Sequence, residues 1–381
     1  MLVKKEIELG GRIFSIETGR YAKQANGSVM VRYGDTMVLV TAVAANEAKE
    51  GLDYFPLQVE YREKTSAAGK FPGGYIKREG RPTEKEILSS RLCDRPIRPM
   101  FPESFKNETQ VIAMVMSYDG ENDPDVLAAC GASAALAISD IPFDGPIAEI
   151  RIGRIAGELV VNPTHEQLKL SDIELVVAGT SDSIMMVEGE SKEVSEQELL
   201  DALKFAQQEI KKIVDLQNQL RTEAGKTKWV VTEKSVDANL KKDVYDLAEA
   251  KFKEIVYSIL AKEERSAKNK ELSESVKKSL AEKYPEQEKV IGEILHDIEK
   301  DLMRERILKE GIRLDGRNTT QVRPITIELG NLPRTHGSAL FTRGETQSLT
   351  NVTLGTKDDE QTVDGLLAEY SKKFYLQYNF P

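Results

Sequence analysis

A short pattern that occurs twice constrains the fold of this chain more than any other feature of its sequence. Three small motifs of the N-terminal part recur near the C-terminal end, namely Gly-Ser at 27–28 and 337–338, Gly-acid-Thr at 34–36 and 344–346, and Leu-Gln at 57–58 and 376–377. The first two are separated by the same offset of 310 residues, and the third by a slightly longer one. A Gly-acid-Thr segment between apolar runs is typical of a hairpin turn. We therefore interpret the pattern as a duplicated domain whose second copy occupies 323–381.

The first copy alternates between strand-like and helix-like segments. Alternating apolar residues bounded by turn residues predict strands. We expect strands at 5–9, 12–17, 29–33, 37–43, 56–61, 111–116, 147–155, 158–161, 173–178 and 184–188. Together with the helices described next, these segments indicate an α+β domain at 1–225, with its helices packed on mixed sheets.

Three helices are expected in the same domain. Thr83 and Glu86 form a capping-box pattern that starts the first helix. Pro96 is expected to end it, because a proline disfavours helical geometry at the residue before it. An Ala-rich helix is expected at 124–138, and a second capping box starts a helix at 195–221.

The remainder of the chain differs in character. Residues 235–308 carry apolar side chains at helical spacing between Lys and Glu, which predicts an all-helical domain without chemistry of its own. The segment 323–381 is expected to be the incomplete start of the second copy, ending with a strand around 376–377. An incomplete sheet exposes an unpaired edge and an apolar face. We therefore expect either a truncated sequence or a segment that depends on a partner.

Composition excludes several classes of protein. The net charge of -10 argues against non-specific coating of nucleic acid, so any such contact must be local. Cys93 and Cys130 have apolar neighbours and indicate buried thiols in a reducing cytosol, which predicts a cytoplasmic protein. Three histidines and no CxxC spacing argue against a zinc site. We find neither a signal peptide nor a membrane-spanning stretch, and expect no membrane partner.

Against this acidic background, residues 75–99 gather basic side chains around one aromatic ring. A Pro-Gly-Gly segment at 72–74 is expected to place this ring at an exposed tip. A ring can stack on a base while fixed cations contact phosphates, which predicts a site for a single-stranded nucleic acid. The candidate binding residues are Tyr75, Lys77, Arg78, Arg91, Arg95 and Arg98. The alternative is that these cations are solvated or pair with the local acids Glu79, Glu84, Glu86 and Asp94.

The segments 78–102 and 334–347 resemble the polynucleotide phosphorylase family of the RNase PH superfamily. In that family an aromatic-aromatic-Arg-Arg loop grips RNA in the neck of a ring; this chain has Tyr-Ile-Lys-Arg at 75–78. The resemblance covers essentially the whole chain. It implies two RNase PH-like cores, an all-α linker and a homotrimeric ring. It also implies 3′→5′ phosphorolysis of RNA to nucleoside diphosphates, reversible, in mRNA degradation, with Mg²⁺ or Mn²⁺ as cofactor and RNA-degradation complexes as partners.

The same resemblance places the catalytic groups of the family in the second core, beyond the end of this sequence. It therefore implies no catalytic residue and no metal ligand in this chain, which is expected to be inactive alone. Asp35 and Glu345 are interpreted as turn formers, His336 as structural and Cys93 as a packing residue. Two other hypotheses stay open: a non-catalytic RNA-binding ring subunit, and an assembly scaffold whose basic patch is buried against a protein.

Overall fold

The computed structural model describes residues 1–49, 52, 54–73, 75–231, 237–367 and 369–380. Gly74 of the candidate loop, Ser235 at the predicted start of the helical domain and Pro381 lie outside the described residues. The chain forms two compact units, Met1–Glu233 with Glu360–Pro381, and Lys234–Asp359. The predicted second copy is thus divided between the units, and the predicted domain boundaries stay a prediction.

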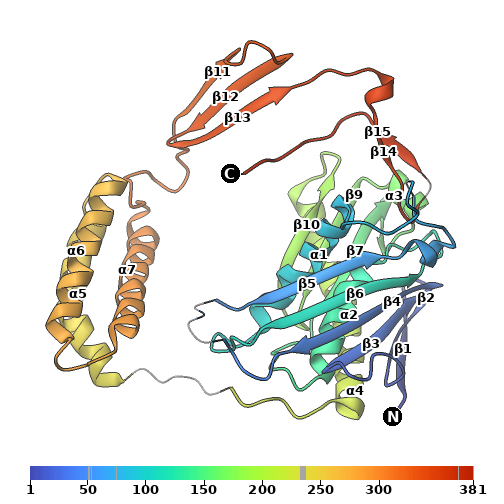
Figure 1. Ribbon diagram of the computed structural model, residues 1–381, viewed down its shortest axis with the longest axis horizontal. Coiled ribbons are helices and arrows are strands. Elements are labelled where there is room, and N and C mark those ends of the chain that lie inside the picture. The colour runs from blue at the N-terminus through green and yellow to red at the C-terminus, as the bar shows by residue number, and fades with distance from the viewer. Residues whose placement is uncertain (50–51, 53, 74, 232–236, 368, 381) are drawn as a thin grey trace. The chain divides into compact units, whose positions relative to one another are not determined.

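A six-stranded sheet forms one layer of the first unit (Figure 1). Its order is β1-β2-β3-β4-β6-β5, and all neighbours are antiparallel except β5 and β6. The strands are β1 (Val3–Leu9), β2 (Arg12–Thr18), β3 (Gly27–Tyr33), β4 (Thr36–Ala44), β5 (Leu57–Glu63) and β6 (Thr109–Ser117). Gly10 and Gly11 join β1 to β2 with φ of +53° and +78°, values that this tight turn requires and that glycine adopts without strain.

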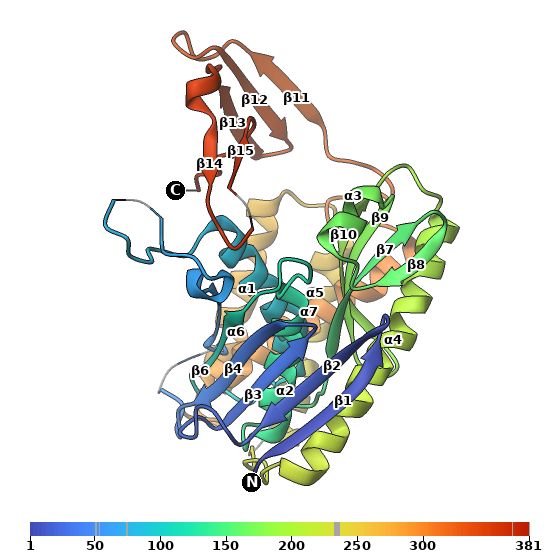
Figure 2. The ribbon, with the colours of Figure 1, turned by 90° about the vertical axis from the view of Figure 1, so that its right-hand side faces the viewer.

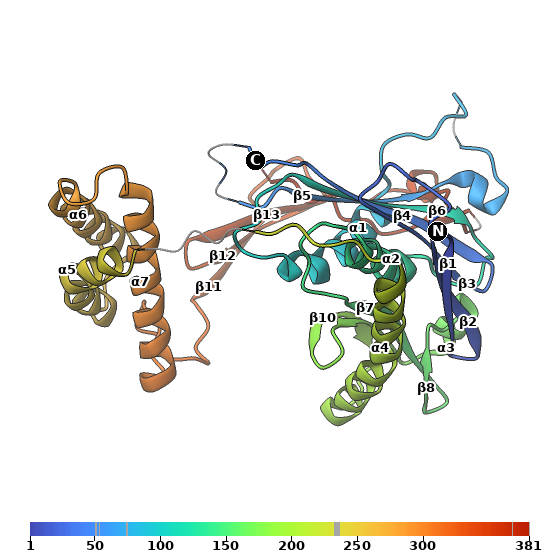
Figure 3. The same ribbon diagram turned by 90° about the horizontal axis from the view of Figure 1, so that it is seen from below.

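A four-stranded sheet and four helices complete the core of this unit. The sheet has the order β10-β9-β7-β8. Its strands are β7 (Ala148–Ile155), β8 (Glu158–Val161), β9 (Ile173–Gly179) and β10 (Ile184–Ser191), and the helices are α1 (Glu84–Ile97), α2 (Asp125–Ile138), α3 (His165–Leu170) and α4 (Glu196–Ala224). Figure 3 shows α2 between the two sheets, and every residue of α2 is buried. Its small side chains suit this position, because they let the strands approach closely.

Helix α1 begins as predicted but ends differently. The Thr83 hydroxyl accepts a hydrogen bond from the Glu86 N–H, and the Glu86 carboxylate accepts one from the Thr83 N–H, which confirms the capping box. The prediction that Pro96 ends the helix is wrong, because Pro96 lies inside α1 and the Arg98 N–H still donates to the Asp94 carbonyl. A proline in the last turn removes only one backbone hydrogen bond, so the chain continues into a 3₁₀ turn.

The second unit contains three helices and a separate three-stranded sheet. The helices α5 (Ala238–Tyr257), α6 (Lys262–Leu280) and α7 (Glu288–Glu310) enclose one apolar cluster, so the predicted helical region is confirmed. The sheet consists of β11 (Ile325–Leu329), β12 (Gly337–Arg343) and β13 (Thr346–Val352), all antiparallel. None of the described helices in either unit combines the length and apolar composition needed to cross a membrane.

The β12–β13 hairpin repeats the β3–β4 hairpin of the first unit. Tyr33 pairs with Thr36 in the first, and Arg343 pairs with Thr346 in the second, at the same register. In the first unit α2 covers β3 and β4, whereas the strands β11 and β13 are exposed along their whole length. The expected uncovered sheet is therefore present in the second copy.

The last part of the chain returns to the first unit as a short hairpin. Its strands are β14 (Gln361–Val363) and β15 (Tyr370–Lys372), which pair antiparallel. The strand predicted around 376–377 is not formed, which is a correction: residues 374–380 have no regular structure. The reason is pairing, since its counterpart β5 pairs only with β6, and the described residues of the second copy include no strand that corresponds to β6.

Candidate nucleic-acid interface

The loop between β5 and α1 carries three of the six predicted RNA-binding residues. Tyr75 is fully exposed at a turn, and Lys77 in the same turn has φ of +50°. The Lys77 and Arg78 side chains are exposed, and neither has an ion-pair partner in the part of the chain that the structure describes. Figure 2 shows this loop extending away from the sheets. It therefore presents the Tyr75 ring and two cations to solvent.

Polar contacts tie the end of this loop to the first sheet. The Glu79 carboxylate accepts hydrogen bonds from Lys64 Nζ at 2.7 Å and from the Thr65 N–H at 3.3 Å. The Lys64 contact lowers the pKa of Glu79, so this carboxylate is ionised near neutral pH. Arg62 of β5 donates to the Gly80 carbonyl at 3.1 Å. The backbone just after Arg78 is thereby held to a sheet strand.

The other three predicted residues lie on the exposed side of α1 and its continuation. Arg91 is exposed and has no ion-pair partner among the described residues. Arg95 forms an ion pair with Glu188 of β10, and Arg98 donates two hydrogen bonds to Asp94 at 3.1 and 2.7 Å. Pairing with a local acid, the alternative weighed from the sequence, thus occurs at Arg98, whereas Arg95 pairs with the distant Glu188. It does not occur at Arg91 within the described chain.

Four exposed apolar side chains accompany these cations and were not predicted as site residues. Phe71 is 87% exposed, Ile76 82%, Ile87 52% and Leu88 56%. Ile87 and Leu88 precede Arg91 by four and three positions, so all three share one helix face. Phe71 could have been predicted as exposed from the sequence, because it directly precedes the Pro-Gly-Gly segment. Apolar helix residues are ordinarily read as core, which is why Ile87 and Leu88 were missed.

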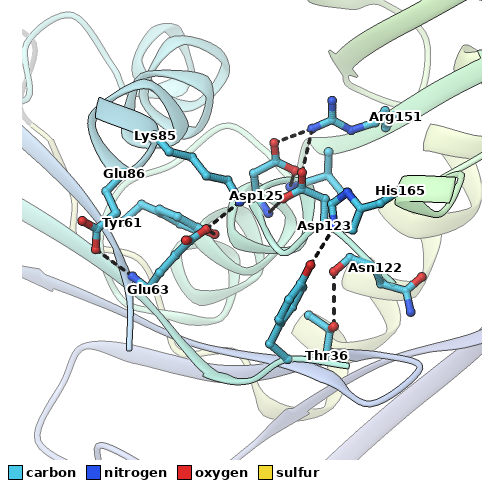
Figure 4. Close-up of polar contacts among 12 residues, drawn as sticks. Thr36, Tyr61, Glu63, Lys85, Glu86, Asn122, Asp123, Asp125, Arg151 and His165 are labelled. Carbon is cyan, nitrogen blue, oxygen red and sulfur yellow. Dashed lines mark hydrogen bonds and ion pairs between the residues drawn. The ribbon is translucent and has the colours of Figure 1, made fainter. Parts of the chain in front are cut away.

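A second polar cluster, at the N-terminal end of α2, was also missed (Figure 4). Lys85 of α1 lies 2.8 Å from the Glu63 carboxylate of β5 and 3.7 Å from that of Asp123. Arg151 of β7 lies 2.5 Å from the Asp125 carboxylate and 3.5 Å from that of Asp123. These five residues come from distant parts of the chain, so no spacing in the sequence could reveal the cluster.

The cluster fills the start of α2 with carboxylates. Burial raises the pKa of Asp125, although Arg151 opposes the shift. Burial also acts on Asp123, but Lys85 and Arg151 lower its pKa. The Asp125 carboxylate accepts a hydrogen bond from the Val126 N–H at 2.6 Å, in a position where a helix N-terminus otherwise binds anions. A phosphate ion here would meet two carboxylates, so the start of α2 is unsuited to phosphate.

The remaining predictions concern metal ligands, the two cysteines and His336. The described residues offer no group of three or more His, Cys, Asp or Glu side chains that could hold a metal ion. Cys93 and Cys130 are both free and buried. Burial raises the pKa of the Cys93 thiol, which agrees with a packing role. The His336 ring accepts a hydrogen bond from the Leu354 N–H at 2.8 Å, a structural contact.

Three family models match consecutive parts of the chain. The model described as "3' exoribonuclease family, domain 1" matches residues 10–142 and again 321–381. The chain belongs to the 3′ exoribonuclease family. Domain 2 of this family matches 145–209, and "Polyribonucleotide nucleotidyltransferase, RNA binding domain" matches 239–318. The duplication inferred from the two Gly-acid-Thr motifs is confirmed, as is the α+β fold with RNase PH-like cores.

Curated relatives within this 3′ exoribonuclease family are named polyribonucleotide nucleotidyltransferase. The chain is 53% identical to the one from Geobacter sulfurreducens over 378 residues, which are 99% of this chain and 54% of the relative. It is 51% identical to the one from Chlorobaculum parvum, covering 100% of this chain and 54% of the relative. The chain thus spans about half the length of the curated relatives it matches.

Among solved structures the chain is similar to rice (Oryza sativa) Rrp46, at 15% identity and a TM-score of 0.45, over 55% of this chain and 94% of that one. The named relatives confirm the resemblance to the polynucleotide phosphorylase family. The six candidate RNA-binding residues stay a prediction.

Proposed function

We propose that this chain is the RNA-binding and ring-building part of a polyribonucleotide nucleotidyltransferase, which degrades single-stranded RNA from its 3′ end with inorganic phosphate. The observation that carries the proposal is the exposed loop that presents the Tyr75 ring together with Lys77 and Arg78, followed by the exposed Arg91 on α1. In a chain with a net charge of -10, these exposed cations offer a polyanion a local site.

Each side chain has a proposed role that follows from its chemistry. The Tyr75 ring stacks on a base, which any nucleotide permits because every base has a π face. Lys77 supplies a point charge, and the guanidinium groups of Arg78 and Arg91 donate paired hydrogen bonds to phosphate oxygens. Arg95 and Arg98 contribute less, because each already contacts a carboxylate.

We assign the phosphorolytic step itself to the second core of the whole enzyme. In this reaction a phosphate oxygen attacks the phosphorus of the terminal phosphodiester, and the bond from that phosphorus to the 3′ oxygen of the preceding nucleotide breaks. The shortened RNA leaves with a free 3′ hydroxyl, and the terminal nucleotide, now joined to the phosphate, is released as a nucleoside diphosphate; the reverse reaction extends the RNA. The start of α2 supports the assignment, because Asp123 and Asp125 already occupy the backbone donor and the cations that a phosphate would need there. A divalent ion, Mg²⁺ or Mn²⁺, belongs to that reaction and neutralises phosphate charge when bound.

The remaining parts of the proposal concern the assembly. We propose a homotrimeric ring in the cytoplasm that acts in mRNA degradation, alone or within RNA-degradation complexes. The proposed domains are a first core at 1–225, a helical domain at 235–308 and the start of a second core at 323–381. Support comes from the two matches of one family model and from the named relatives.

RNA binding by the 381-residue chain tests the proposal. The double variant Arg78→Ala with Arg91→Ala removes two phosphate contacts. We expect roughly tenfold weaker binding and a slope of log affinity against log salt that falls by about 1.4, since each contact to a single strand contributes about 0.7. Fluorescence anisotropy of a labelled oligonucleotide across a salt series measures both quantities.

The matched control is Lys23→Ala with Lys211→Ala. Both lysines are exposed and have no ion-pair partner in the described part of the chain, so the control removes the same charge elsewhere. An equal loss of affinity in both double variants would indicate a general charge effect. That result, or unchanged binding by the Arg78 and Arg91 variant, would refute the proposed RNA-binding face.

A further inference from the structure

The β14–β15 hairpin contacts the first part of the candidate RNA-binding loop. Lys70 Nζ donates to the Gly365 carbonyl at 2.9 Å and also to the Leu367 carbonyl. Asp364 lies against the loop at Gly73, where an added Cβ would be 2.5 Å from a carboxylate oxygen of Asp364. The turn of the hairpin therefore contacts the loop just before its exposed tip.

The same hairpin also contacts the far end of the loop. Lys372 Nζ lies 2.9 Å from the carboxylate of Glu84, the first residue of α1. Leu366, in the turn between the two strands, is only 5% exposed and belongs to the main apolar cluster of the first unit. The buried Leu366 thus anchors the hairpin to the first unit. Polar contacts of Lys70 and Lys372 join the hairpin to residues 70 and 84, on either side of the loop tip.

We propose that the β14–β15 hairpin positions the RNA-binding loop, with Lys70, Leu366 and Lys372 as positioning residues. This inference rests on the proposed function. A loop whose ends are held in place loses less conformational freedom when RNA orders it, so holding the ends strengthens binding. Because the hairpin lies within the second match of the family domain, at 321–381, the second copy controls the RNA contact of the first.

Limited proteolysis tests the positioning without RNA. Trypsin cleaves after Lys77 and Arg78, and mass spectrometry of the fragments follows these two sites. In Lys70→Met and in Lys372→Ala we expect cleavage there to become about 3 to 10 times faster, because the loop opens more often. Lys373→Ala is the matched control: it removes one charge at the neighbouring position, and Lys373 is exposed without an ion-pair partner in the described chain.

RNA binding by the same variants tests the consequence. Lys70→Met and Lys372→Ala are expected to bind a single-stranded oligonucleotide about 3 to 10 times more weakly, and Lys373→Ala nearly as well as the unmodified chain. The charge exchange Lys372→Glu with Glu84→Lys keeps the net charge and is expected to restore both affinity and slow cleavage. Urea unfolding of each variant shows whether the fold is retained.

The outcomes separate this inference from the function on which it rests. If Lys70→Met and Lys372→Ala equal Lys373→Ala in both assays, the hairpin does not position the loop, whatever the Arg78 and Arg91 variant shows. Faster cleavage with unchanged RNA affinity also overturns the inference. Loss of affinity in the Arg78 and Arg91 variant, measured beside them, shows independently that the loop binds RNA.

Discussion

At the scale of single residues, Glu149 on β7 has unfavourable surroundings for a charge. Its side chain is buried, and within the described residues neither carboxyl oxygen has a hydrogen-bond partner. Burial raises the pKa of Glu149 well above its ordinary value, and the nearby Asp125 adds to the shift. The folded chain therefore holds a proton here that the unfolded chain releases.

This proton makes stability depend on pH in a definite direction. A raised folded-state pKa contributes stability that is complete below the unfolded pKa of about 4.3 and is lost as pH rises from there. Between pH 5 and 7 the free energy of unfolding is expected to fall by up to about 1.4 kcal/mol per pH unit from this group. Glu149→Gln should remove that part of the slope, as measured by urea unfolding at several pH values.

The control is Glu158→Gln on the neighbouring strand β8, where the side chain is exposed. It should leave the slope unchanged. If Glu149→Gln gives the same slope as the unmodified chain, the carboxyl group is not protonated in the folded state and the interpretation of its burial is wrong.

At the scale of elements, the packing of α2 on β3 explains one glycine of the repeated motif. A Cβ at Gly27 would lie 2.0 Å from the Ala135 carbonyl oxygen of α2, a distance that real atoms do not reach. At the equivalent Gly337 of β12, a Cβ would meet only Val352, at 3.8 Å. The same residue in the same hairpin thus has different surroundings in the two copies.

The repeat supplies its own matched pair of variants. Gly27→Ala is expected to destabilise the first unit by about 2 kcal/mol or more, because β3 and α2 must move apart. Gly337→Ala should change stability by less than about 0.5 kcal/mol, as exposed substitutions usually do. Thermal or urea unfolding measures both, and equal effects would contradict the role given to α2.

At the scale of the whole molecule, the proposed function divides two tasks between two copies of one domain. In the first copy the start of α2 is occupied by Asp123 and Asp125, which are paired with Lys85 and Arg151 (Figure 4). The candidate RNA-binding cations lie elsewhere in the same copy, on α1 and the loop before it. Under the proposed function, binding of RNA and attack by phosphate are separable, and this chain is expected to do the first.

This separation predicts the outcome of a decay assay. Incubated with RNA, inorganic phosphate and Mg²⁺, the chain should bind RNA but release no nucleoside diphosphate, because Asp123 and Asp125 already occupy the groups that phosphate would need at the start of α2. Chromatography of the products, with a full-length relative as positive control, measures the release. Phosphate-dependent release above the phosphate-free control would place a reaction centre within this chain.

The sequence was sufficient for features whose cause is local. Capping boxes at Thr83 and Ser195 and the glycine turns depend on a few neighbouring residues, and the structure has them where they were expected. The repeat was visible because both copies keep the same hairpin. The prediction from neighbouring residues was wrong at Pro96, where one missing hydrogen bond did not end the helix. Helix α3 was not predicted, although Thr164 and Gln167 form a capping box at its start.

Tertiary structure alone decided which cations are paired with carboxylates and which distant residues the other cations contact. Arg91 and Arg95 look alike in sequence, yet among the described residues only Arg95 has a carboxylate partner, Glu188, which is 93 residues away. Lys70 reaches Gly365 across 295 residues, a contact no local pattern encodes. Helix starts and turns follow from short-range sterics and hydrogen bonds, which the order of residues determines. Charge pairing and desolvation depend on which distant segments the fold brings within a few ångströms.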